Sequence, residues 1–168
     1  MEPRRLVLLR HAKSSWDDPS LDDHARPLAG RGRRDAPRVA AALVERGFAP
    51  AFVLTSDARR AVDTWALAAP VVGGNVGVHA TRLLYHGGLP ELGEAAQVVP
   101  ATAGVLWCVG HNPDWEDLVH ALCGVAVTLP TGAAAVLDGA GEDWGSALRG
   151  RWVWRERLRP RDLARGEE

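Results

Sequence analysis

Short apolar runs alternate along the chain with longer segments in which apolar residues recur at helical spacing. The short runs are typical of buried strands, because they are too brief for a helix and are mostly apolar throughout. We expect strands at 6–9, 51–55, 76–79, 105–109, 133–137 and 150–155. We expect helices at 31–45, 58–69, 90–98 and 114–122. This alternation predicts an α/β fold, a three-layer α/β/α sandwich with a mainly parallel central sheet.

Residues at the segment ends support these boundaries. Ser56 and Asp57 are good N-cap types for the helix that follows them, and Pro70 is expected to end that helix. A Gly- and Asp-rich loop is expected to join the last two strands. Trp152 and Trp154 fall on one face of the final strand, where we expect them to pack.

Length and composition limit the kind of protein this can be. The 168 residues fit one domain with a single core, and a hydrophobic content of 46% is ordinary for a globular protein. The Arg- and Glu-rich residues 156–168 are expected to form a solvated tail of that domain. No apolar run approaches the roughly 20 residues of a membrane span, and no signal peptide precedes the first strand. We therefore expect a soluble cytoplasmic protein with no membrane partner.

Charge and cysteine content point to local chemistry. The formal net charge of -1 gives no overall attraction to nucleic acid, and no nucleic-acid partner is expected. Any recognition of phosphate must then come from locally clustered arginines. Cys108 and Cys123 are expected to be small core residues and not a disulfide.

Polar residues that suit an anion follow three of the expected strands. Arg10 and His11 follow the first strand, Ser56 and Arg60 the second, and His111 a later one. Parallel strands bring these ends to one edge of the sheet, where open α/β sheets bind ligands. A guanidinium offers a planar set of donors to phosphate oxygens, and an imidazole can act as nucleophile, acid or base. We therefore expect an anion site at this edge.

Other chemistries are disfavoured by missing motifs. His11 and His111 could be metal ligands, but the nearby guanidiniums disfavour a divalent cation, and no His-x-His, HExxH or Cys/His cluster is present. We expect no metal and no cofactor. The chain also lacks a P-loop, the dinucleotide-binding GxGxxG, the GxSxG of acyl hydrolases, and a Cys followed six residues later by Arg. Phosphoryl transfer to an imidazole nitrogen remains, with Arg10, Arg60 and a cationic or hydrogen-bonding His111 holding the equatorial oxygens.

Four separated segments resemble, in order, the histidine phosphatase superfamily of phosphoglycerate mutase-like proteins, and most closely its small SixA-like branch of phosphohistidine phosphatases. The resemblance covers about residues 5–125. The matching segments are Arg10-His11-Ala12-Lys13-Ser14, Arg26-Pro27-Leu28 with Gly30 or Gly32, Ser56-Asp57-Ala58-Arg59-Arg60 through Thr64, and Gly110-His111-Asn112-Pro113. Ala12 replaces the hallmark Gly and Asp57 replaces the usual Pro, and neither change removes a group that the chemistry needs.

The resemblance implies roles for the residues that match. It implies that His11 is the phosphorylated nucleophile, that Arg10 and Arg60 bind the phosphate, and that His111 is the second active-site histidine. Arg59 is then a neighbour and not a ligand. Further possible site residues are Ser14, Arg26, Ser56, Tyr85 and Glu91.

No residue is assigned as the general acid, which mutase-like relatives supply with a Glu. Tyr85 and His86 are expected to line the rim of the pocket. Glu91 either donates the proton or, as we favour, only stabilises the first turn of its helix. The remaining polar candidates are expected to solvate loops or to be surface or core residues: Asp17, Asp18, Asp22, Asp23, His24, His79 and His120.

These expectations combine into a metal-independent phosphatase that works through a phosphohistidine intermediate on His11. The expected substrate is a phosphorylated protein, above all a phosphohistidine protein. Two alternatives stay open: a phosphatase of small phosphorylated metabolites, and a non-catalytic phosphate-binding module, which the presence of both arginines and both histidines disfavours. The oligomeric state stays open as well.

Overall fold

The computed structural model describes residues 1–163, and its centre is a six-stranded sheet in the order β3-β2-β4-β1-β5-β6. The strands are β1 (Pro3–Arg10), β2 (Phe52–Ser56), β3 (Gly77–Thr81), β4 (Val105–Gly110), β5 (Ala134–Ala140) and β6 (Val153–Leu158). Strands β3, β2, β4 and β1 are parallel, whereas β5 runs antiparallel to β1 and β6 antiparallel to β5. The expected mainly parallel sheet is confirmed.

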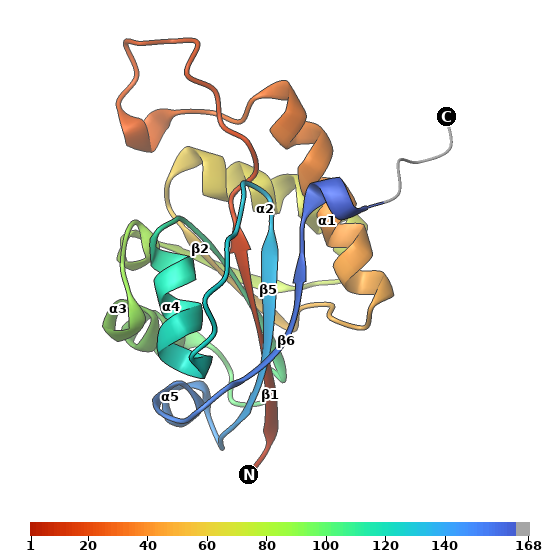
Figure 1. The fold of residues 1–168 in the computed structure, drawn as a ribbon, viewed down its shortest axis with the longest axis vertical. Helices are drawn as coiled ribbons and strands as arrows, with labels where there is room; N and C mark the ends of the chain where they lie inside the picture. The colour runs from red at the N-terminus through yellow and green to blue at the C-terminus, as the bar shows by residue number, and fades with distance from the viewer. Residues whose placement is uncertain (164–168) are drawn as a thin grey trace.

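Helices cover both faces of this sheet (Figure 1). On one face lie α1 (Gly30–Glu45) and α2 (Arg59–Val72), and on the other lie α3 (Leu89–Ala95), α4 (Asp114–Cys123) and α5 (Trp144–Arg149). The short 3-10 helices are η1 (Asp23–Ala25), η2 (Arg82–Leu84), η3 (Ala96–Val98) and η4 (Pro160–Asp162). The three layers are those that the sequence pattern predicts, although the helix expected at 90–98 divides into α3 and η3.

Alternation along β1 explains why the sheet is covered on both sides. Val7 and Leu9 pack in the cluster with α1 and α2, whereas Leu6 and Leu8 pack in the cluster with α3, α4 and α5. Because β4 and β5 also flank the strand, these four side chains are at most 2% exposed. A strand buried on both faces is apolar at every position, which is the pattern from which it was predicted.

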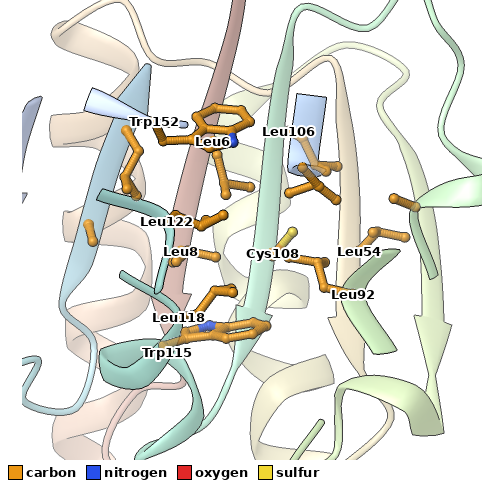
Figure 2. Close-up of a cluster of buried hydrophobic side chains, with 14 of the residues drawn as sticks. Leu6, Leu8, Leu54, Leu92, Leu106, Cys108, Trp115, Leu118, Leu122 and Trp152 are labelled. Atoms are coloured by element: carbon orange, nitrogen blue, oxygen red, sulfur yellow. The ribbon is translucent and has the colours of Figure 1, made fainter. Parts of the chain in front are cut away.

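The expected core role of Cys108 is confirmed. It lies among Leu8, Leu92 and Trp115 in the cluster between the sheet and the helices α3 and α4 (Figure 2). Burial raises the pKa of its thiol, which therefore stays protonated. Cys123 is a free, half-buried thiol that donates to the Val119 carbonyl, so neither cysteine belongs to a disulfide.

Helix α2 differs from the expectation at both ends. Its N-cap is Ala58, since the Asp57 carboxylate is instead bonded to His24. Pro70 lies inside the helix, which continues to Val72. A proline in the last turn keeps a helical φ and removes only one N–H donor, so the helix can run on for the few residues that remain. The expected end at Pro70 is wrong.

The loop expected between the last two strands contains a helix. Asp143 begins α5 by accepting the Ser146 N–H at 2.7 Å, and Trp144 and Leu148 are buried against the core. A six-residue helix held by one cap and two apolar contacts carries too weak a period to be seen in the sequence.

The expected solvated tail at 156–168 is wrong for its first residues. Strand β6 begins at Val153, later than the expected 150, and continues to Leu158, which is 3% exposed in the cluster with α1 and α2. The burial of Leu158 in the core stabilises the strand, although the residues around it are mostly charged. Residues 164–168 of the expected tail lie outside the described residues. None of the helices described within 1–163 combines the length and the apolar character needed to cross a membrane.

Candidate active site

The carboxyl ends of parallel strands bring two histidines together, as expected. Strands β1 and β4 pair in the register Arg10 to Gly110, so His11 and His111 follow at the same level. The His11 N–H donates to the Gly110 carbonyl at 2.9 Å, and the two imidazole rings lie 5.2 Å apart between centroids. The sheet register itself therefore sets this pair.

His11 is a neutral imidazole with one defined tautomer. Its Nδ1 lies 2.7 Å from the Ala12 carbonyl oxygen, which can only accept, so Nδ1 carries the proton and Nε2 keeps its lone pair. That Nε2 lies 3.4 Å from Nε of Arg60. Burial, together with the Arg60 and Arg10 cations, lowers the pKa of His11 to about 3. The ring thus presents a nucleophilic nitrogen beside a cation.

His111 is oriented by β2 and by the same arginine. Its Nδ1 accepts from Nη2 of Arg60 at 3.3 Å, so its proton lies on Nε2, which donates to the Ser56 hydroxyl oxygen at 2.8 Å. Burial lowers the pKa of His111 to about 2, with His11 and Arg60 adding to the effect. The sequence candidate Ser56 thus lies in the site and fixes the ring of His111.

Arg10 and Arg60 both place guanidinium N–H donors at the carboxyl ends of the parallel strands. Arg60 is 3% exposed in the first turn of α2, whereas its neighbour Arg59 is exposed and pairs with Asp63. Arg10 donates from Nη1 to the Leu129 carbonyl at 2.9 Å, but its buried Nε has no partner among the described residues. Burial lowers the pKa of Arg10. An unpaired buried donor is costly, and here it is available to a ligand oxygen.

Asp23 is part of the site, and its expected role as a loop-solvating residue is wrong. Its carboxylate accepts from Nη2 of Arg60 at 2.9 Å and from the Tyr85 hydroxyl, while its backbone carbonyl accepts from Nη1 of Arg60 at 2.6 Å. Despite an opposing effect of burial, hydrogen bonds from Tyr85 and Arg60 hold the pKa of Asp23 well below its usual range. Only the length of the connection at 12–30 hints at such a role in the sequence.

Ser14 and Arg26, both sequence candidates, extend this network. Arg26 is 6% exposed and donates from Nη1 to the Ser14 hydroxyl oxygen at 2.8 Å. It also donates from Nη2 to the Asp23 carboxylate at 3.1 Å. Arg26 therefore holds Asp23, and Ser14 holds Arg26.

Two rings from the segment after β3 form the rim, as expected. The rings of Tyr85 and His86 lie 5.4 and 4.8 Å from that of His111 between centroids. His86 has φ +63°, an unusual value outside glycine, and its Nδ1 lies 2.8 Å from a carboxylate oxygen of Asp114. Asp114 is a site residue that the sequence reasoning missed, since it becomes a neighbour only through the turn that precedes α4.

The other polar candidates divide between the rim, a helix end and the surface. Glu91 is not brought to the histidines, because its carboxylate accepts the Gly88 N–H at 2.9 Å at the start of α3. His24 was expected at the surface or in the core, but it lies at the rim, 4.9 Å from the Tyr85 ring between centroids. His79 and His120 are exposed, as expected.

The arrangement has the parts needed to handle a phosphoryl group. The guanidiniums of Arg10 and Arg60 can meet anionic oxygens, and the neutral Nε2 of His11 lies beside Arg60, whereas the Nε2–H of His111 donates to Ser56. Desolvation strengthens these interactions, because His11, Arg60 and His111 are almost entirely shielded from water. The geometry therefore supports attack by nitrogen on phosphorus.

Comparison with known proteins agrees with this geometry. The family model of the histidine phosphatase superfamily (branch 1) matches residues 6–84. An uncharacterized chloroplastic protein of Arabidopsis thaliana is 37% identical over 155 residues, which are 86% of this chain and 71% of that protein.

Solved structures share the whole fold. A candidate phosphohistidine phosphatase SixA from Agrobacterium tumefaciens is 27% identical, with 94% of this chain and 99% of that chain covered at a TM-score of 0.77. The protein histidine phosphatase SixA complexed with tungstate is 19% identical, with 95% and 99% covered at a TM-score of 0.81. The chain belongs to the histidine phosphatase superfamily, in its SixA-like branch.

Proposed function

We propose that this phosphatase removes phosphoryl groups from histidine side chains of proteins through a covalent intermediate on His11. The observation that carries the proposal is the neutral, buried imidazole of His11, whose unprotonated Nε2 lies 3.4 Å from Arg60. A neutral ring nitrogen is the nucleophilic form, and no proton has to be removed before attack. In this role Arg10 and Arg60 bind the phosphoryl oxygens, and His111 joins them when its Nε2–H turns from the Ser56 hydroxyl oxygen to the substrate.

The reaction divides into two displacements at phosphorus. First, Nε2 of His11 forms a bond to phosphorus while the P–N bond to the substrate imidazole breaks. The substrate ring, already protonated from solvent on its other nitrogen, leaves with the electron pair as a neutral imidazole. Water then attacks phosphorus, the P–Nε2 bond breaks, and inorganic phosphate and neutral His11 are released. The proposed donors face charge that grows on the equatorial oxygens in both steps.

The carboxylates near the site favour a nitrogen leaving group. An alkoxide is a poor leaving group and needs a proton from a carboxylic acid with a raised pKa. Here hydrogen bonds from Tyr85 and Arg60 lower the pKa of Asp23, and Glu91 caps its own helix. An imidazole that is protonated on nitrogen leaves as a neutral ring, so phosphohistidine needs no such acid.

The positive charge of the proposed pocket comes from guanidinium groups. Arg10 and Arg60 lie close to His11, and a divalent cation placed beside them would be repelled. We therefore propose that turnover is independent of metal ions.

A panel of three substrates tests this function. Steady-state rates are measured on a histidine-phosphorylated protein, an aryl phosphate and an alkyl phosphate, with and without EDTA. We expect rapid turnover of the first two, an alkyl phosphate rate lower by about 10² or more, and no effect of EDTA. Glu91→Gln serves as the control variant and is expected to match the wild-type protein on all three.

Two results would contradict the proposal. Fast alkyl phosphate hydrolysis that collapses in Glu91→Gln would make Glu91 the acid and the protein a phosphatase of small metabolites. Activity that disappears with EDTA and returns with a divalent ion would show that catalysis depends on a metal ion and not on the arginines alone.

A further inference from the structure

Trp16 is an exposed aromatic residue on the loop beside the proposed catalytic histidine. All seven tryptophans lie within the described residues, and five of them are at most 8% exposed. Trp154 packs partly buried against the core, whereas Trp16 is 70% exposed. A tryptophan is highly buried on average and is enriched at protein interfaces, so an exposed ring on this loop is a candidate contact for a partner.

The loop holds Trp16 in a fixed position. Ser14 and Leu28 form an antiparallel bridge across the base of the loop, and the Ser15 N–H donates to the Pro27 carbonyl at 2.8 Å. One residue beyond Trp16, the Asp17 N–H donates to the Ser15 hydroxyl oxygen. The ring is therefore presented on a hydrogen-bonded turn.

One face of the Trp16 ring is already covered from within the protein. The guanidinium carbon of Arg26 lies 3.4 Å from the ring centroid, which is the distance of a stacked cation–π contact. Arg26 is buried and is itself held by Ser14 and Asp23. The remaining exposed surface of the ring is available to a partner without loss of this support.

Trp16 is connected to His11 through three intervening side chains. Contacts run from Trp16 to Arg26, from Arg26 to Asp23, and from Asp23 to Arg60, which reaches Nε2 of His11. Its loop extends beyond the carboxyl end of β1 (Figure 1). A molecule that contacts both His11 and Trp16 therefore reaches past Arg60, Asp23 and Arg26.

We propose that Trp16 is a docking residue that binds an apolar surface patch of the histidine-phosphorylated protein, next to its phosphorylated side chain. This inference rests on the proposed function and names what recognises the protein part of the substrate. His11 is only 6% exposed, so the phosphorylated side chain enters the site while the rest of its protein lies against the loop. Rigid exposed tryptophans are the residues that contribute most at protein interfaces.

The test compares a large and a small substrate in the same variants. In Trp16→Ala we expect KM for the histidine-phosphorylated protein to rise about tenfold or more with kcat within about twofold, and kcat/KM for an aryl phosphate to change by less than about threefold. Trp16→Phe keeps an aromatic ring and is expected to restore most of the affinity. Val153→Ala is the matched control, because Val153 is 69% exposed but pairs with Asp138 at the opposite end of the sheet.

Each other pattern contradicts the inference in a recognisable way. Equal losses on both substrates in Trp16→Ala would mean that the ring only positions Arg26. Unchanged kinetics of Trp16→Ala on both substrates would contradict docking at Trp16. An equal rise in KM for the histidine-phosphorylated protein in Val153→Ala would contradict it as well. If wild-type protein hydrolyses aryl phosphate but not the histidine-phosphorylated protein, the proposed function itself fails, and the docking inference fails with it.

Discussion

Burial keeps the two central histidines neutral at physiological pH, and this neutrality is what makes His11 a nucleophile in our account. Shielding from water lowers the pKa of His11 to about 3 and that of His111 to about 2. A histidine in an unfolded chain has a pKa near 6.5. Between these values the unfolded chain binds more protons than the folded one, so the free energy of unfolding must fall as the pH falls.

We therefore predict that acidification weakens the fold through these histidines. From pH 6.5 to 5, His11 alone should lower the free energy of unfolding by on the order of 2 kcal/mol. The Asp23 pKa is also depressed, but a depressed carboxyl contributes its loss only below about pH 4, where the unfolded chain takes up its proton. Urea unfolding of the wild type and of His11→Asn at pH 7 and pH 5 measures the effect. Equal losses in the two proteins would show that His11 is not buried in its neutral form.

The two arginines should each supply part of the charge stabilisation. Arg10→Ala and Arg60→Ala are expected to lower kcat/KM by about 10², the usual cost of one preorganised donor. Arg59→Ala is the matched control, because Arg59 is exposed and pairs only with Asp63 on the surface of α2, and we expect a change of less than about twofold. Because Arg60 is buried, circular dichroism must first show that its variant is folded. Similar losses in all three variants would indicate a general charge effect in place of a pocket.

At the scale of elements, α1 is packed directly against the segment that follows His11. A Cβ on Gly32 would lie 2.2 Å from the Lys13 carbonyl oxygen, whereas a Cβ on Gly30 would meet only the flexible end of Arg34 at 3.5 Å. The Lys13 carbonyl also accepts the Ala29 N–H at 2.8 Å. Of the two glycines that the sequence leaves open, the close approach singles out Gly32.

Gly32→Ala should therefore damage both the fold and the site. We expect a loss of about 1–3 kcal/mol in the free energy of unfolding, because the backbone of Lys13 or the helix must move, and a fall in kcat because Lys13 lies two residues beyond His11. In Gly30→Ala we expect a change of less than about 0.5 kcal/mol and normal kcat. Thermal and urea unfolding together with steady-state kinetics distinguish the two. Equal tolerance of alanine at both positions would refute the proposed contact.

Elements with a strong hydrophobic period could be predicted from the sequence, and weakly patterned ones could not. The runs before His11 and before His111 lie in the interior of the sheet, so their uninterrupted apolar content predicts buried strands. Helix α5 was missed because it is held by the cap at Asp143 and by tertiary burial of Trp144. Strand β1 begins at Pro3, earlier than the predicted residue 6. The charged Arg4 is not expected inside a buried strand, but its buried guanidinium donates to backbone carbonyls of distant loops.

The same contrast holds for the site. His11 and His111 directly follow strands, so the sheet topology predicted their meeting. Asp23 and Asp114 lie outside the strands, and their positions depend on how loops and turns fold against Arg60 and His86. No local pattern in the sequence encodes such contacts.

In the whole molecule, the net charge and the local charge at the site differ. The net charge of -1 gives no overall field for anions, yet the arginines at one edge of the sheet gather around two neutral histidines. The fold belongs to the histidine phosphatase superfamily, and we propose that the rim and loop around this edge select the substrate.

The most direct test of the account is a search for the phosphorylated enzyme itself. Wild-type protein is mixed with a substrate that carries a radiolabelled phosphoryl group, quenched within the first turnovers, and digested to locate the label. We predict an acid-labile, alkali-stable label on His11, absent from His11→Ala and retained in His120→Ala, whose histidine is exposed and remote. Active enzyme that carries no label at any quench time, or an acid-stable label on Ser14 or Ser56, would contradict a phosphohistidine intermediate on His11.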